Sequence, residues 1–106
     1  MNVTLGQVVY SRAGRDSGRL FLVSALVDES YVLIVDGDLK RIEKPKKKKI
    51  KHLKSTGYIL EPLKEKFESG LRVSNSEIRK ALENIRQKIE SAKNIEDINS
   101  LSYKEV

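Results

Sequence analysis

Hydrophobic positions in the first half of the chain predict a series of short strands. Residues 7–12 are rich in β-formers, with Val8, Tyr10 and Arg12 on one face. Residues 19–26 are apolar on both faces over most of their length, and residues 31–35 form a third apolar run. A strand without polar alternation is usually covered on both sides or packed inside a tightly curled sheet. We therefore expect this strand to be covered on both sides or to lie inside a tightly curled sheet.

Glycine-containing and polar segments separate these runs and predict turns. The segment Gly14-Arg15-Asp16-Ser17-Gly18 has turn chemistry, because its two glycines adopt positive φ without strain. The pair Asp36-Gly37 between apolar residues is typical of a two-residue hairpin. We expect residues 39–42 to pair back onto residues 31–35.

The rest of the first half is strongly basic. Pro45 and the adjacent lysines indicate an extended loop over residues 43–49, since proline cannot donate to a ladder and like charges repel. We expect residues 50–53 to form a short closing strand. Four or five short strands with glycine turns predict a small barrel.

The second half changes to a helical period. Ser74 and Glu77 form a capping box, and Val73 and Ile78 stand at the positions of a hydrophobic staple. An apolar stripe follows at helical spacing and consists of Ile78, Leu82, Ile85, Ile89 and Ala92. Residues 62–69 predict a shorter helix, with Pro62 in its first turn and a glycine past its end. Residues 94–101 predict one or two further helical turns.

The distribution of charge along the chain indicates the kind of partner that the protein binds. The chain of 106 residues has a net charge of +6, and residues 1–60 contain 12 Lys and Arg against 6 Asp and Glu. Residues 61–106 contain 9 of each, so the whole excess lies in the predicted strand region. Segregated positive charge favours a polyanionic partner.

Several classes of protein are disfavoured by the residues that the sequence lacks. There is no cysteine, which excludes disulfides and thiolate metal sites and fits a reducing, cytoplasmic compartment. We expect no membrane span and no export signal, because the longest apolar run covers only residues 20–27. No set of base, nucleophile or ligand residues is recognisable, so we expect no enzymatic activity, no metal and no cofactor.

Two groups of residues in the first half carry a resemblance to a known family. Gly6-Gln7-Val8-Val9, followed by Ala13-Gly14-Arg15-Asp16-Ser17-Gly18-Arg19 and an apolar strand, is similar to a KOW motif. The later segments 31–37, 39–41 and 45–46 strengthen the similarity. Together they resemble KOW-domain RNA-binding proteins related to the eukaryotic- and archaeal-type large-subunit ribosomal protein family fourteen, which has free-standing bacterial members. The similarity covers residues 4–56 and does not extend to residues 60–106.

The resemblance implies an SH3-like β-barrel of the KOW type, with ribosomal or other structured RNA as the ligand and no catalytic activity. We thus expect an α+β protein with the barrel over residues 1–58 and a helical C-terminal extension over residues 59–106, packed on the barrel. The candidate RNA-binding residues are Arg12, Gly14, Arg15, Gly18, Arg19, Lys40, Arg41, Lys44, Lys46, Lys47, Lys48, Lys49, Lys51, His52 and Lys54. Arginines fit phosphate oxygens bidentately, and lysines contribute affinity without reading bases.

Other interpretations stay open at this point. The turn arginines and the lysines could be solvated surface groups, and Tyr10 is the candidate for stacking on a base. The stripe packs on the barrel or on the shorter helix, or else Ile78, Leu82, Ile85 and Ile89 bind a protein partner. The alternative functions are therefore a protein-interaction adaptor that uses the helices and a transcription-elongation accessory factor.

Overall fold

The structure, a computed structural model, describes residues 2–12, 14–15 and 17–105, with side chains described as far as Ala92. Its strands are β1 (Gln7–Ser11), β2 (Leu20–Leu26), β3 (Tyr31–Val35), β4 (Lys46–Lys49) and β5 (Leu53–Ile59). A 3₁₀ turn (Ile50–His52) joins the last two strands, and the helices α1 (Glu61–Glu68) and α2 (Asn75–Glu105) follow. The protein is therefore α+β, as the two periodicities predict.

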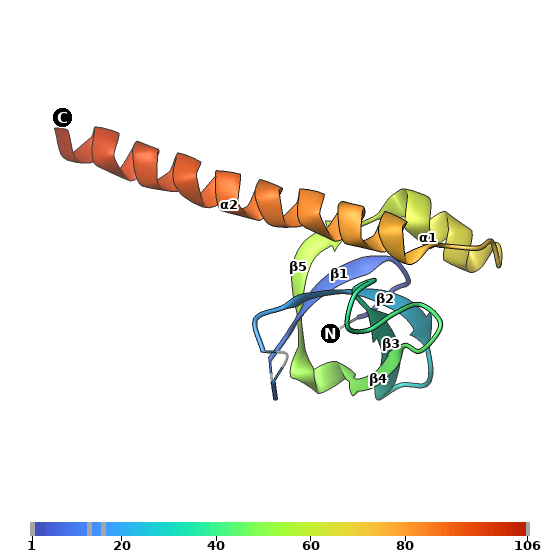
Figure 1. Ribbon diagram of the computed structural model, residues 1–106. Coiled ribbons are helices and arrows are strands. Elements are labelled where there is room, and N and C mark those ends of the chain that lie inside the picture. Colours follow the sequence, from blue (N-terminus) through green and yellow to red (C-terminus); the bar gives the residue numbers. More distant parts are fainter. Residues whose placement is uncertain (1, 13, 16, 106) are drawn as a thin grey trace.

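The five strands form one antiparallel sheet in the order β4-β3-β2-β1-β5. The strands curve around a common interior, and the 3₁₀ turn connects the two edge strands (Figure 1). No pairing between β4 and β5 links the described residues, so the sheet is open.

The sheet is buried on both faces, as the apolar pattern of residues 19–26 predicts. Phe21, Leu22 and Val23 are consecutive in β2, and all three are fully buried. Phe21 and Val23 belong to an interior core with Val9, Val32, Ile34 and Leu53. Leu22 belongs to a helix-side core with Val8, Val35, Leu63, Val73, Ile78, Leu82 and Ile85. Each face of β2 therefore contributes to a separate hydrophobic cluster.

Helix α2 lies across the sheet and runs on past it (Figure 1). The predicted capping box is confirmed: Glu77 N–H donates to Ser74 Oγ at 3.1 Å, and Ser74 N–H donates to the Glu77 carboxylate at 3.1 Å. Ile78, Leu82 and Ile85 are buried against the sheet, whereas Ala92 is exposed. The interpretation of this stripe as a packing surface is confirmed. Residues 94–101, predicted as separate turns, continue the same 31-residue helix.

Glycines allow both helices to approach the sheet region closely. A Cβ on Gly6 would lie 2.7 Å from Cβ of Lys64 in α1. A Cβ on Gly37 would overlap the Asn75 carbonyl oxygen and lie 3.0 Å from Cγ of Arg79 in α2. Real Cβ atoms do not tolerate such contacts with backbone, so the two helices are seated where a side chain is missing.

The predicted hairpin at Asp36-Gly37 is wrong. The side chain of Asp36 accepts hydrogen bonds from the N–H groups of Asp38 (2.9 Å) and Lys40 (2.8 Å) and so closes a local turn. Such Asp side-chain bonds compete with strand pairing. Residues 39–42 consequently do not pair with β3, and the loop extends over residues 36–45.

The lysine run predicted as a loop is instead strand β4. Lys46, Lys47, Lys48 and Lys49 pair with Ile34, Leu33, Val32 and Tyr31 of β3. Alternate side chains of a strand point to opposite faces, so neighbouring ammonium groups are separated. Lysines on an edge strand also discourage pairing with another chain.

The predicted closing strand over residues 50–53 is only partly correct. Residues 50–52 form the 3₁₀ turn, and the strand β5 begins at Leu53, continues to Ile59 and pairs with β1. The strand thus extends beyond the predicted segment. In this extension, Thr56 Oγ1 donates a hydrogen bond to the Val8 carbonyl at 2.8 Å.

Among the described residues, none of the helices has the length and apolar character needed to span a membrane.

Candidate nucleic-acid interface

The β1–β2 turn has the conformation that its glycines predict. Gly14 and Gly18 both have positive φ, at 78° and 84°. Ser17 N–H donates to the Gly14 carbonyl (3.2 Å), and Gly18 N–H donates to the Ser11 carbonyl (2.9 Å). Arg15 is exposed in this turn, whereas Ala13 and Asp16 lie outside the described residues. The turn therefore presents one arginine to solvent beside a hydrogen-bonded backbone.

The structure gathers part of the candidate residues around a groove beside the 3₁₀ turn, called here the basic groove. It has a volume of about 690 Å³ and is lined by Arg12, Glu29, Ser30, Tyr31, Lys49, Ile50, Lys51 and Leu53. Two backbone bonds assemble it: Arg12 N–H to the His52 carbonyl (2.7 Å), and Ile50 N–H to the Ser30 carbonyl (2.8 Å). Segments from the end of β1, the β2–β3 turn and the end of β4 thus meet at one place.

The cations of the basic groove have no ion-pair partner among the carboxylates that the structure describes. Arg12, Lys49 and Lys51 are exposed, and none of the described carboxylates forms an ion pair with them. Lys54 is also exposed and sits opposite Tyr10 where β5 pairs with β1. An unpaired surface cation is fully available to an incoming phosphate.

A second set of candidate residues lies at the other end of β3, around loop 36–45. Arg19 donates to the Asp36 carboxylate at 3.2 Å, and Arg41 lies 3.7 Å from the Glu43 carboxylate. Lys40 contributes its backbone to the Asp36 turn, and Lys44 is exposed at the end of the loop. The two arginines of this set are already engaged by carboxylates, so the candidate residues do not form one continuous surface of free charge.

The four lysines of β4 differ in their surroundings. Lys47 and Lys49 are exposed, whereas Lys46 and Lys48 are half-buried opposite Ile34 and Val32 of the interior core. Nζ of Lys47 lies 4.6 Å from the ring centroid of Tyr31, a cation–π distance. Lys47 and Lys49 are therefore the more accessible lysines of β4, and Lys47 also contacts an aromatic ring.

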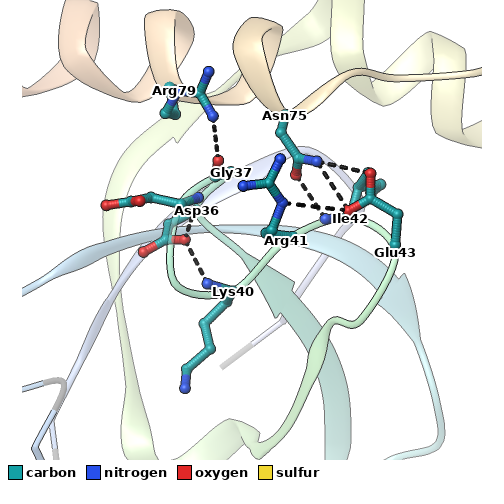
Figure 2. Close-up of polar contacts among 9 residues, drawn as sticks. Asp36, Gly37, Lys40, Arg41, Ile42, Glu43, Asn75 and Arg79 are labelled. Carbon is teal, nitrogen blue, oxygen red and sulfur yellow. Dashed lines mark hydrogen bonds and ion pairs between the residues drawn. The ribbon is translucent and has the colours of Figure 1, made fainter.

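Loop 36–45 is held by polar contacts from the first turns of α2 (Figure 2). Arg79 donates to the Gly37 carbonyl at 2.6 Å. Asn75, which is buried, accepts from Ile42 N–H (2.8 Å) and donates to both Glu43 oxygens (2.8 and 2.9 Å). The loop that carries Lys40, Arg41 and Lys44 is thus fixed to the helix. Sequence patterns did not single out Asn75 or Arg79. Their hydrogen-bond partners lie in loop 36–45, most of which was predicted as part of a hairpin.

The pKa of Glu43 lies below its ordinary value, mainly because of the hydrogen bond from Asn75. A lowered folded-state pKa means that ionised Glu43 favours folding at neutral pH and that this contribution is lost as the pH falls through that pKa. We predict that Asn75→Ala raises the pKa of Glu43 toward the usual glutamate range, as measured by carboxyl-carbon NMR titration. The pKa of Glu83, which is lowered mainly by Arg86, serves as the control and should not change. An unchanged Glu43 pKa in the variant would contradict this assignment.

Comparison with known families gives no assignment, since no protein-family model matches the chain. Among the described residues, no three His, Asp or Glu side chains are grouped as a metal site. The geometry itself therefore carries the functional argument. Its main feature is the set of cations in the basic groove that have no ion-pair partner in the described part of the chain.

Proposed function

We propose that this chain is a non-enzymatic RNA-binding protein that contacts the phosphate backbone of structured RNA through a basic face. One observation supports this most: Arg12 from the end of β1 lines one groove with Lys49 and Lys51, and none of the three has a carboxylate partner among the described residues. The groove also contains Glu29, so its lining has three cations against one carboxylate. An excess of positive charge raises the local positive potential, to which phosphates are attracted.

The proposed face includes three further exposed cations of the first half of the chain. Lys47 and Lys54 are exposed on the two edge strands, and Arg15 is exposed in the turn after β1. Arginine forks suit phosphate oxygens, and lysines act as point charges, so the face would supply affinity more than base recognition. The turn with Gly14 and Gly18 would set the register of the protein on the RNA.

The resemblance to KOW-domain proteins supports a more specific form of the proposal. On that basis the curled, open sheet is an SH3-like barrel of the KOW type, and the RNA is ribosomal. The face of the proposed interface lies within the segment of similarity, residues 4–56. A transcription-elongation accessory factor would use the same face on another RNA or complex.

Salt dependence of RNA binding tests the proposal. We predict that the triple variant Arg12→Gln, Lys49→Gln, Lys51→Gln has a log-affinity against log-salt slope that is shallower by about 2 to 3, at ~0.7–0.9 per lost phosphate contact. The affinity of the full chain for a structured RNA hairpin is measured by fluorescence anisotropy at several salt concentrations.

A matched variant separates the position of the charges from their number. Arg72→Gln, Lys80→Gln, Lys88→Gln removes the same charge from exposed residues of the helical half and should leave the slope nearly unchanged. Equal slopes for the two triple variants would show that net charge alone attracts RNA. Absence of measurable binding by the wild type at low salt would refute the proposal.

A protein-interaction adaptor is the second candidate, and one observation favours it: α2 extends well past the sheet (Figure 1). Such an adaptor would use the projecting part of the helix, since Ile78, Leu82 and Ile85 are covered by the sheet. Partners that remain bound to the full chain after nuclease treatment of a lysate would favour the adaptor, and partners released by nuclease would favour RNA binding.

A further inference from the structure

We infer that the basic groove binds one unpaired nucleotide of the RNA, with its base against Tyr31 and its phosphates between Arg12, Lys49 and Lys51. This inference rests on the proposed function and adds a specific ligand subsite to it. An unpaired nucleotide combines a flat, largely apolar base with an anionic phosphate. The groove offers a complementary surface to each part.

The chemistry of the lining matches both parts of such a ligand. Leu53 is 3% exposed and belongs to the interior core, against which Ile50 packs, so these residues give the groove an apolar floor. Arg12, Lys49 and Lys51 surround that floor with three positive charges, opposed by the single carboxylate of Glu29. The volume of about 690 Å³ falls within the ~300–1,000 Å³ range of small-ligand sites.

Tyr31 is the aromatic side chain of this groove. It is half-buried at the start of β3, opposite Lys49, and Lys47 lies over its ring at 4.6 Å. A ring ordered by strand pairing and a cation loses little freedom when a base stacks on it. Bases stack on such rings with little dependence on sequence, which suits a protein that otherwise contacts phosphates.

A second hollow, between the sheet and α2, provides a contrast. It contains Tyr10 and the arginines Arg19, Arg79 and Arg86, but also four carboxylates, Asp36, Asp38, Glu83 and Glu90. Arg19 and Arg86 form ion pairs with Asp36 and Glu83, and Arg79 binds the Gly37 carbonyl. This hollow therefore has a net negative charge, which repels phosphate, so Tyr31 is favoured over Tyr10 as the base-binding ring.

The test compares a fully paired, blunt-ended RNA duplex with the same duplex carrying one bulged nucleotide. The full-length wild type should bind the bulged RNA more tightly, and Tyr31→Ala should weaken that binding about 5- to 150-fold, the range measured for loss of one stacked base. Binding of the fully paired duplex should be unchanged. Tyr31→Phe retains the ring and should retain the preference, while Tyr10→Ala is the control in the other hollow.

The possible outcomes separate this inference from the proposed function. Equal binding of both duplexes by the wild type would overturn the nucleotide subsite while leaving phosphate binding intact, and no binding of either RNA would overturn both. If Tyr31→Ala is poorly folded, a 4-thiouridine at the bulge of the wild-type complex should crosslink to the peptide that contains Tyr31. Crosslinking confined to other peptides would overturn the subsite. Tighter, Tyr31-dependent binding of a glutamate-rich peptide than of the bulged RNA would assign the groove to an acidic protein instead.

Discussion

Gly37→Ala should destabilise the protein by about 2–5 kcal/mol, because two costs add at this position. Gly37 has a φ of 78°, which costs a residue with a Cβ roughly 1–2 kcal/mol. The added Cβ would also overlap the backbone carbonyl oxygen of Asn75 and press on Arg79, so α2 would have to shift. Overpacking of this kind typically costs about 1–3 kcal/mol. The free energy of unfolding is measured by urea denaturation.

Gly57→Ala is the matched control for this prediction. Gly57 has a φ of 87°, but an added Cβ would meet nothing within 4 Å. It should therefore show the conformational cost alone, roughly 1–2 kcal/mol. If the two variants were equally destabilised, the close approach of α2 to loop 36–45 would be contradicted.

Ile78→Ala should destabilise the protein by about 2–5 kcal/mol through a cavity in the helix-side core. Ile78 is fully buried one turn into α2, and it shares this core with Val8, Leu22 and Val35. Because a small domain has a total stability of about 5–15 kcal/mol, this change would remove a large part of it. Urea denaturation should show a lower midpoint with an unchanged m-value.

Ile89→Ala is the control in the same stripe, since Ile89 is only partly buried at the edge of this core. Its expected loss is about 1 kcal/mol, in proportion to the smaller apolar area removed from contact. Equally small effects of both substitutions would mean that the stripe does not pack on the sheet in solution. It would then be free to bind a partner.

The elements that follow from local patterns were predictable from the sequence. Strands β1 to β3, the two-sided burial of β2 and the capping box of α2 all follow from residue type and spacing. Strand β4 was not predicted, because repulsion between adjacent lysines disfavours a strand. Backbone pairing with β3, which local residue types do not show, stabilises it. The 36–45 loop was missed because the Asp36 carboxylate replaces strand partners with local hydrogen bonds.

The sequence identifies the basic residues of the candidate site, but it does not show which of them lie together or which are paired with carboxylates. Basic residues are visible in the sequence, whereas the carboxylates that engage Arg19 and Arg41 are assigned only by the fold. Tyr31 was not singled out as a candidate, because its place beside Lys47 and Lys49 depends on the register of β3 with β4. In paired consecutive strands the register depends on the length and geometry of the connecting loop, here residues 36–45, which was predicted wrongly.

NMR mapping of a bound RNA hairpin tests the central claim most directly. Titration of the full-length, isotope-labelled chain should shift the amide signals of Arg12, Lys49 and Lys51, which line the basic groove. It should also shift those of Arg15 and Lys54, the further cations of the proposed face. The amide signals of residues 83–90 in α2 should not shift. No shifts at low salt, or shifts confined to α2, would contradict RNA binding through the basic face.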